Sequence, residues 1–174
     1  DKNEGFQRQI HNIENTPFRT KFERDLADFR GHAGLGCISD SDPQPLLVRS
    51  HLGLYAIVTV GIINNTDELV KAYLSDKGQQ FLTLSSGRVN VTELTAALIN
   101  QENDLVSGIL HAMEVIDGSM TILILTEEGE LIAARDSMGR LPVLIGQRED
   151  GYCVSFESFA YHKLDYQDAY ELGP

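Results

Sequence analysis

The sequence predicts an α+β sandwich of antiparallel strands rather than an alternating parallel sheet. Strand-like apolar runs gather at residues 46–63 and again at 120–156, and the helical patterns lie between them at 65–117. Parallel sheets need strands and helices to alternate along the chain. The grouped order therefore favours antiparallel sheets with helices packed on their faces.

Composition limits the class of protein. The 174 residues are 42% hydrophobic and 23% charged, values typical of one globular domain. The chain carries 26 acidic and 14 basic residues and a net charge of −12. Such a charge repels phosphate backbones, so we expect no nucleic-acid partner.

Neither a membrane span nor a secretory signal is predicted. The longest apolar run, 52–63, is shorter than the roughly 20 residues that cross a bilayer, and it reads as a buried strand. Residues 1–5 are polar, and the lack of an initiator Met indicates a start inside a longer protein. Cys37 and Cys153 form neither a disulfide framework nor a metal site, so we expect a cytoplasmic protein without a bound metal.

The first elements are read from local patterns. Apolar residues spaced four, four and three apart predict one helix, with Pro17 in its first turn: Phe18, Phe22, Leu26 and Phe29. The glycine-rich segment 31–37 lacks the Lys-Ser/Thr of a phosphate loop. We predict instead a strand lying close against another backbone.

Two strands and three helices follow. Residues 46–48 and 54–60 predict a pair of strands. Asn65 and Asn90 each precede a Glu by three positions, which is the pattern of a capping box at a helix start. Asp104 opens a third helix.

The C-terminal third predicts two hairpins. Strands at 120–125 and 131–134 flank a tight turn, and strands at 143–145 and 152–156 form the second hairpin. We expect Asp150-Gly151 to form its type I′ turn.

Six segments share their order and spacing with one known family. They lie at 34–39, 42–46, 61–69, 135–142, 155–158 and 173–174. The segment Arg-Asp-Ser-Met-Gly-Arg-Leu-Pro at 135–142 is similar to that family's Arg-Asp-Pro-x-Gly-x-Arg-Pro-Leu. From about residue 31 onward the chain resembles the class II glutamine amidotransferases, of the N-terminal-nucleophile hydrolase type, and among them the amidophosphoribosyltransferases.

The resemblance implies a particular architecture. It implies a four-layer αββα sandwich of two antiparallel sheets that lacks its first strand and helix. Residues 1–174 would form one glutaminase-like domain, truncated at the N-terminus and followed in the intact protein by a phosphoribosyltransferase domain. It also implies a homo-oligomer, and no cofactor in this domain.

The family's catalytic group has no counterpart here. The family uses a Cys as first residue, whose thiolate attacks the glutamine amide while its own α-amine acts as base. Position 1 here is Asp, and Cys37 and Cys153 are interior residues without a free α-amine. The resemblance therefore assigns no catalytic residue to this chain.

The substrate contacts also depart from the family pattern. Its carboxylate-binding arginine falls on Ser39, and the preceding histidine falls on Cys37. Its oxyanion pair, an asparagine side chain and the next glycine N–H, falls on Val60 and Gly61. An acid that binds the substrate amine is expected at 86–92, where none occurs.

We therefore expect a degenerate glutamine site that does not hydrolyse glutamine. The pocket candidates are Cys37, Ser39 and Gly61, with glutamine or an analogue as the ligand. Two alternatives remain open: an active glutaminase whose Cys segment is absent from this chain, and a non-catalytic ligand-binding or regulatory module. We interpret Asp40 and Asp42 as capping a turn, and Arg135 with Asp136 as an ion pair bracing a turn at Gly139.

Overall fold

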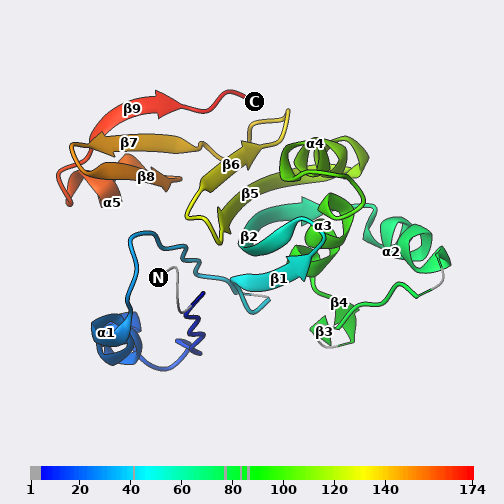
Figure 1. The fold of residues 1–174 in the computed structure, drawn as a ribbon, viewed down its shortest axis with the longest axis horizontal. Coiled ribbons are helices and arrows are strands. Elements are labelled where there is room, and N and C mark those ends of the chain that lie inside the picture. Colours follow the sequence, from blue (N-terminus) through cyan, green and yellow to red (C-terminus); the bar gives the residue numbers. More distant parts are fainter. Residues whose placement is uncertain (1–4, 41, 77, 83, 86) are drawn as a thin grey trace.

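The computed structural model describes residues 5–40, 42–76, 78–82, 84–85 and 87–174 (Figure 1). The helices are α1 (Phe18–Asp28), α2 (Thr66–Ser75), α3 (Val91–Ile99), α4 (Leu105–Val115) and α5 (Ser158–His162). The strands are β1 (Leu46–Ser50), β2 (Gly53–Ile63), β3 (Leu84–Ser85), β4 (Arg88–Val89), β5 (Gly118–Thr126), β6 (Leu131–Arg135), β7 (Leu144–Arg148), β8 (Gly151–Ser155) and β9 (Gln167–Glu171).

The described strands form antiparallel sheets, as the sequence predicts. A four-stranded sheet has the order β1-β2-β5-β6, a three-stranded sheet has the order β8-β7-β9, and β3 pairs with β4. Figure 1 shows α2, α3 and α4 on one side of the four-stranded sheet and the three-stranded sheet on its other side. With α5 packed on β7, this is an α+β fold of the αββα type.

The main core lies between the four-stranded sheet and the helices. Because side chains alternate along a strand, Tyr55 and Ile57 of β2 and Ile122 of β5 meet buried residues of α3, such as Leu94. The other face of the same sheet is buried as well, through Ala56, Val58, Leu123 and Leu125. Burial on both faces explains why 52–63 is almost continuously apolar.

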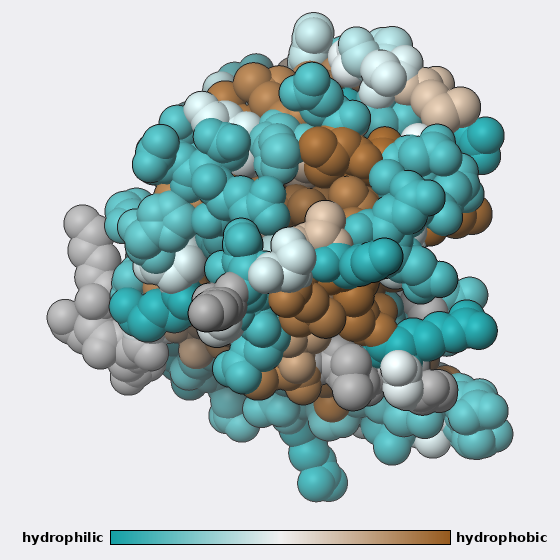
Figure 2. Space-filling view, turned by 90° about the vertical axis from the view of Figure 1, so that its right-hand side faces the viewer, coloured by the Kyte–Doolittle hydropathy of each residue, from teal (hydrophilic) through white to brown (hydrophobic). Residues whose placement is uncertain are grey.

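The outer side of the helix layer is partly apolar. Figure 2 shows this side, where hydrophobic areas interrupt a mostly hydrophilic surface. Exposed apolar side chains on α2 and α4 are Leu74, Val106 and Leu110. α4 buries Gly108, Ile109 and Ala112, whereas α2 has no fully buried residue and packs Leu69 and Val70 against the core.

The predicted helix at the start of the chain is confirmed, but its apolar stripe is not buried. Phe18 is 47% exposed and Leu26 is 59% exposed. Within the described residues, the hydrogen bonds of segment 5–30 stay inside that segment, as in the pairs His11–Asp25 and Arg30–Gln7. The segment packs on itself rather than on the sheets.

The predicted close-packed strand at 31–37 is wrong. No strand forms there, and a Cβ added at Gly34 or Gly36 would meet nothing within 4 Å. Three glycines leave the segment few side chains to bury, so little offsets the entropy cost of fixing it in a sheet.

Two of the three predicted helix caps are confirmed. The Asn90 side chain accepts the Glu93 N–H at 3.0 Å, and Asp104 accepts the Ser107 N–H at 2.9 Å. Asn65 makes no cap; it donates to the Val115 carbonyl and accepts the Asp117 N–H. Asn65 and Asn90 are both followed by a Glu three positions later. The Asn65 side chain does not cap its helix because it makes tertiary hydrogen bonds at the end of α4 instead.

The predicted type I′ turn at Asp150-Gly151 is also wrong. The last paired residues of this hairpin are Arg148 and Gly151, so the loop is 149–150. A type I′ turn needs positive φ at both loop residues, and neither has it. Instead the Arg148 guanidinium binds both oxygens of Asp150, at 2.6 and 2.8 Å, which lowers the pKa of that carboxyl.

Candidate functional site

The oxyanion candidates lie near the end of β2. Val60 pairs with Thr121 of β5, and Gly61 pairs with Met120. Because neighbouring strand residues point to opposite faces, the Val60 side chain points to the face that is turned away from α3. An apolar side chain thus occupies this position on the inner face of the two-sheet sandwich.

The Gly61 N–H is directed to an open sheet edge. Both backbone groups of Met120 bond to Asp136 instead of β2, with its N–H donating to Oδ2 at 2.9 Å and its carbonyl accepting the Asp136 N–H at 3.0 Å. Gly61 and Met120 are therefore a pair without mutual hydrogen bonds. On the other side of β2, pairing to β1 ends at Leu46↔Ile57, and the N–H of the exposed residue Gly61 has no hydrogen-bond partner among the described residues.

The Gln44 side chain extends that pairing by one step. Its amide donates to the Thr59 carbonyl at 3.1 Å, and its carbonyl accepts the Thr59 N–H at 2.8 Å. The side chain thereby replaces a strand residue opposite Thr59. Gly61 is the next residue of β2 that faces this edge, and β1 does not reach it.

Gly61 also has a structural reason to be glycine. A Cβ there would lie 1.9 Å from the Ser119 carbonyl oxygen, and one on Gly118 would lie 1.9 Å from the Ile62 carbonyl oxygen. The two strands approach more closely here than any side chain permits.

Ser39 lies on the segment that leads into β1. It is exposed, and its hydroxyl accepts the Asp42 N–H at 3.2 Å. Asp42 in turn accepts the Val91 N–H at 3.2 Å at the start of α3. The chain from Ser39 to Gln44 is thus fixed against α3 and β2 by side chains that bond to backbone.

Asn90, predicted as a helix cap, stands next to Val91, whose N–H binds Asp42. It is fully buried; its oxygen caps α3, while its Nδ2 has no partner among the described residues. The nearby acid Glu93 accepts the Leu82 N–H at 2.7 Å. Asp1 and Ser86, two other positions considered above, lie outside the described residues.

The thiols are poor nucleophiles. Burial raises the pKa of Cys37 and of Cys153, so both are protonated near neutral pH. Among the described residues, no group of three or more His, Cys, Asp or Glu side chains is arranged to hold a metal ion.

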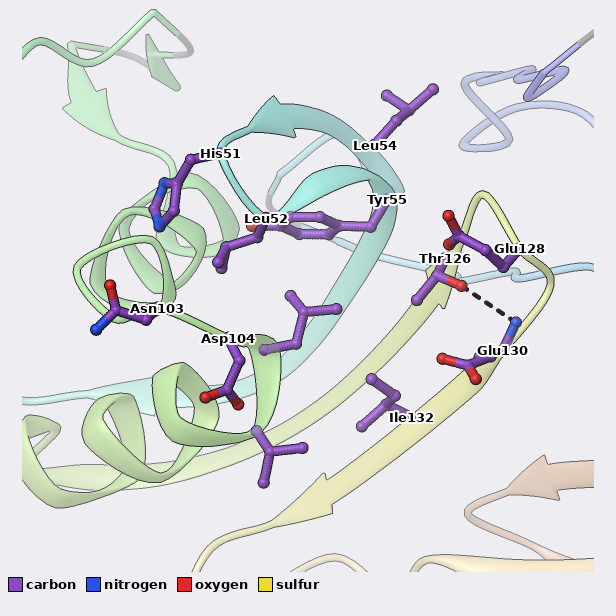
Figure 3. Close-up of a pocket in the computed structure, with 12 residues that line it drawn as sticks. His51, Leu52, Leu54, Tyr55, Asn103, Asp104, Thr126, Glu128, Glu130 and Ile132 are labelled. Atoms are coloured by element: carbon purple, nitrogen blue, oxygen red, sulfur yellow. Dashed lines mark hydrogen bonds between the residues drawn. The ribbon is translucent and has the colours of Figure 1, made fainter.

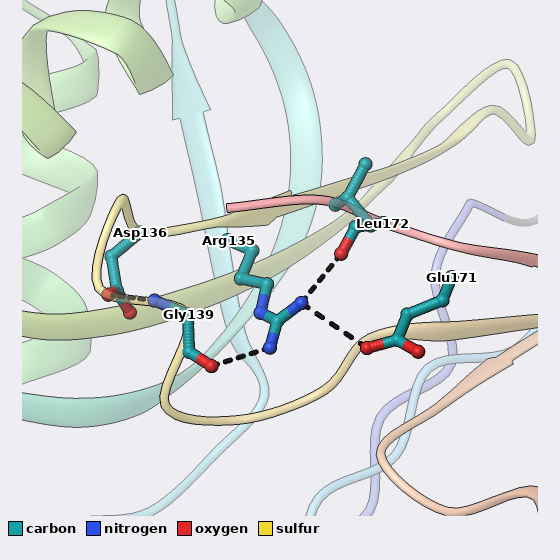
Figure 4. Close-up of polar contacts among 5 residues, drawn as sticks. All are labelled: Arg135, Asp136, Gly139, Glu171 and Leu172. Atoms are coloured by element: carbon teal, nitrogen blue, oxygen red, sulfur yellow. Dashed lines mark hydrogen bonds and ion pairs between the residues drawn. The ribbon is translucent and has the colours of Figure 1, made fainter.

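Arg135 is the cation in the same cross-strand row as Val60, on the same sheet face. Its guanidinium donates to the carbonyls of Leu172 at 2.7 Å and Gly139 at 2.5 Å, and it lies 3.6 Å from Glu171 (Figure 4). Two N–H groups of its guanidinium thus bind backbone carbonyls.

The predicted ion pair between Arg135 and Asp136 is wrong, because adjacent strand residues point to opposite faces. Asp136 instead accepts N–H groups of Met120, Met138 and Gly139 at 2.9, 2.9 and 3.1 Å. Both residues do brace the turn at Gly139, but each binds it separately (Figure 4).

Comparison with known families decides what this sandwich is. The family model described as a glutamine amidotransferase domain matches residues 33–161. The chain belongs to this family. The matched residues include the four-stranded sheet and strands β7 and β8 of the three-stranded sheet, while β9 lies beyond them.

Several curated relatives of this amidotransferase domain are amidophosphoribosyltransferases. The Archaeoglobus fulgidus protein is 30% identical over 121 residues, covering 70% of this chain and 26% of the relative. The Methanocaldococcus jannaschii protein is 28% identical over 157 residues, covering 86% of this chain and 33% of the relative. The Bacillus subtilis protein is 35% identical over 121 residues, covering 68% of this chain and 24% of the relative. The chain thus spans about a quarter to a third of the length of these relatives.

Solved structures support the same family. The glutamine phosphoribosylpyrophosphate amidotransferase from B. subtilis, complexed with ADP and GMP, aligns with a TM-score of 0.66 and 31% identity over 76% of this chain and 28% of that one. A structure described as the allosteric regulatory enzyme of purine biosynthesis aligns with a TM-score of 0.65 and 31% identity. That alignment covers 77% of this chain and 28% of the other. The predicted resemblance and its two-sheet fold are confirmed. Across the described part of this amidotransferase domain, no helix is long and apolar enough to cross a membrane.

Proposed function

We propose that this amidophosphoribosyltransferase-like glutamine amidotransferase domain has a degenerate glutamine site and does not hydrolyse glutamine. The observation that carries the proposal is the pair Val60-Gly61. The exposed Gly61 N–H keeps one of the two donors that stabilise an oxyanion, whereas Val60 has no donor to offer. Loss of one such donor costs about 10²–10³ in rate.

The carboxylate contact supports the same conclusion. A glutamine carboxylate is held best by the paired N–H groups of an arginine. Ser39 can offer at most one O–H donor and no positive charge, and its hydroxyl oxygen accepts the Asp42 N–H. Arg49 pairs with Leu54 near the opposite end of the sheet from Gly61. The exposed Arg88 has no hydrogen bond or ion pair to Ser39 within the described residues.

The available thiols support it too. Cys37 is the cysteine on the same segment as Ser39, and its raised pKa leaves little thiolate at neutral pH. As an interior residue it also lacks the free α-amine that serves as base in this family.

Release of glutamate from L-glutamine tests the proposal. With purified natural protein we expect no more glutamate than the buffer produces. Steady release would contradict the proposal, and its loss on Cys37→Ala would identify that thiol as the nucleophile. Cys153→Ala, on β8, is the matched control for removing a thiol.

A further inference from the structure

A pocket lies at the opposite end of the four-stranded sheet from Gly61. It is bounded by the β1–β2 turn, the start of α4 and the β5–β6 hairpin, and its volume is about 430 Å³ (Figure 3). That volume lies within the range of small-molecule sites. The Tyr55↔Thr126 pair, at the pocket end of β2 and β5, is six residues along β2 from Gly61.

Five apolar side chains form part of the pocket lining. Leu52 and Leu54 come from the strand pair, Leu105 and Val106 from α4, and Ile132 from β6. Val106 is 59% exposed, so its side chain is available to a ligand. These residues can bind an aliphatic or aromatic body.

The rim is acidic. Asp104, Glu128 and Glu130 line the pocket, and no Lys or Arg is among its lining residues. The Ser107 N–H and hydroxyl hold the pKa of Asp104 low, so this carboxylate is ionised. Figure 3 shows Asp104 and Glu130 on opposite walls, from α4 and from the hairpin.

Two other polar groups of the rim are engaged within the protein. The ring Nε2 of His51 lies 2.8 Å from the Glu102 carbonyl oxygen, a donor's geometry, and the Thr126 hydroxyl accepts the Glu130 N–H at 3.2 Å. Asp104 itself accepts the Ser107 N–H at 2.9 Å and the Ser107 hydroxyl at 2.7 Å. A carboxylate offers about four acceptor sites, so Asp104 can still accept a hydrogen bond from a ligand.

We propose that this pocket binds an organic cation, an ammonium or guanidinium group carried on an apolar body. Apolar walls bind the body while separated carboxylates attract the charge. A metal ion fits less well, because no metal-holding cluster of His, Cys, Asp and Glu occurs among the described residues. The proposal does not depend on the state of the glutamine site at the other end of the sheet.

Titration of the ¹⁵N-labelled protein with phenethylammonium chloride tests this by NMR. Saturable amide shifts are expected at Leu54, Asp104 and Glu130. Equal titration with neutral 2-phenylethanol should give much weaker binding, and so should methylammonium, which lacks the apolar body. Equal binding of the alcohol would overturn the proposal, and so would the absence of a saturable shift in the pocket with both this amine and the basic peptide described below.

Charge-neutral variants distinguish attraction of the cation by the pocket carboxylates from attraction by the overall negative charge of the protein. Combining Asp104→Asn with Glu130→Gln should raise the dissociation constant about tenfold. Asparagine remains a good N-cap, so α4 should persist. Glu149→Gln, on the distant β7–β8 hairpin, should leave the constant unchanged. If the double variant behaves like Glu149→Gln, the carboxylates do not bind the cation and the assignment fails.

A second titration distinguishes two sources of the same chemistry. The probe is the blocked peptide acetyl-Leu-Lys-Leu-amide. Saturation by the free amine alone indicates a small molecule, whereas saturation by the peptide alone indicates a basic side chain of a protein. Either result supports an organic cation site, and failure of both probes overturns it.

Discussion

Neighbouring residues of β6 and its turn act in different ways. Arg135 connects the turn at Gly139 to the C-terminal segment through Leu172. Asp136 is 7% exposed and connects the same turn to Met120 of β5. A buried carboxylate that accepts three N–H groups cannot be replaced by an amide without setting a donor against a donor.

Asp136→Asn should therefore lower the free energy of unfolding by about 2–3 kcal/mol, because at least one buried N–H loses its acceptor. Denaturant unfolding measures the change. Asp150→Asn, which affects an exposed pair with Arg148, should cost about 0.5 kcal/mol or less. Equal effects of the two variants would show that the buried network contributes nothing special.

Tyr55 and Tyr161 should lose their phenol protons at a higher pH than an ordinary tyrosine. A hydrogen bond from Tyr161 to the Asp168 carboxylate raises the pKa of Tyr161 to about 12, and burial raises that of Tyr55 to about 12. Their folded pKa values exceed the unfolded value of about 10. The stability they contribute is complete below pH 10 and is lost as the pH rises from about 10 to 12.

Ultraviolet absorbance of tyrosinate checks this expectation. The native protein should show a late step, and Tyr161→Phe should remove part of it. Asp168→Asn should move the Tyr161 contribution to lower pH, because the hydrogen-bonded carboxylate causes the shift. A single titration near pH 10 for all six tyrosines would contradict the described contacts.

At the scale of elements, two glycines of this domain have different roles. Gly61 lies where β2 and β5 approach each other, whereas Gly34 has open space around its Cβ position. Gly61→Ala should cost more than about 3 kcal/mol, because a Cβ 1.9 Å from a backbone oxygen forces strands apart. Gly34→Ala should change stability by no more than about 0.5 kcal/mol. Thermal unfolding of both variants gives the comparison, and similar losses would contradict the strand packing.

The elements also show what the sequence can predict. Strands β2 and β5 follow from apolar runs, because burial on both faces imposes that pattern directly. The roles of Asn65 and Asn90 do not follow, because both begin the same local pattern and only tertiary contacts separate a cap from a bridge to Val115. The Asp136 network was missed for the same reason, since its partner Met120 lies sixteen residues earlier in the sequence.

For the candidate site, the sequence predicts which residue types are present, but not where their side chains and backbone N–H groups point. Val60 and Gly61 were identified from resemblance alone, and the open edge at Gly61 depends on where β1 pairing ends and on Asp136 binding Met120. Cys37, Ser39 and Gly61 were grouped as one pocket. The described hydrogen bonds link Ser39 to Asp42, and Asp42 to α3, but they do not link Ser39 to Gly61.

At the scale of the whole molecule, the sandwich and the N-terminal segment are separate packing units. The family model matches from residue 33, and the described hydrogen bonds of residues 5–30 stay within that segment. Removal of residues 1–32 should therefore leave the cooperative unfolding of the sheets within a few degrees of its original midpoint. Calorimetry measures this, and loss of the transition would show that α1 stabilises the sandwich.

The central claim is that this amidotransferase fold no longer holds glutamine at the end of β2. Titration of the ¹⁵N-labelled protein with L-glutamine tests it most directly, with the amides of Ser39 and Gly61 as reporters. The account predicts no saturable shift at either amide up to millimolar glutamine. A saturable shift at both, weakened by replacing Ser39 but unchanged by replacing Ser119, would contradict it.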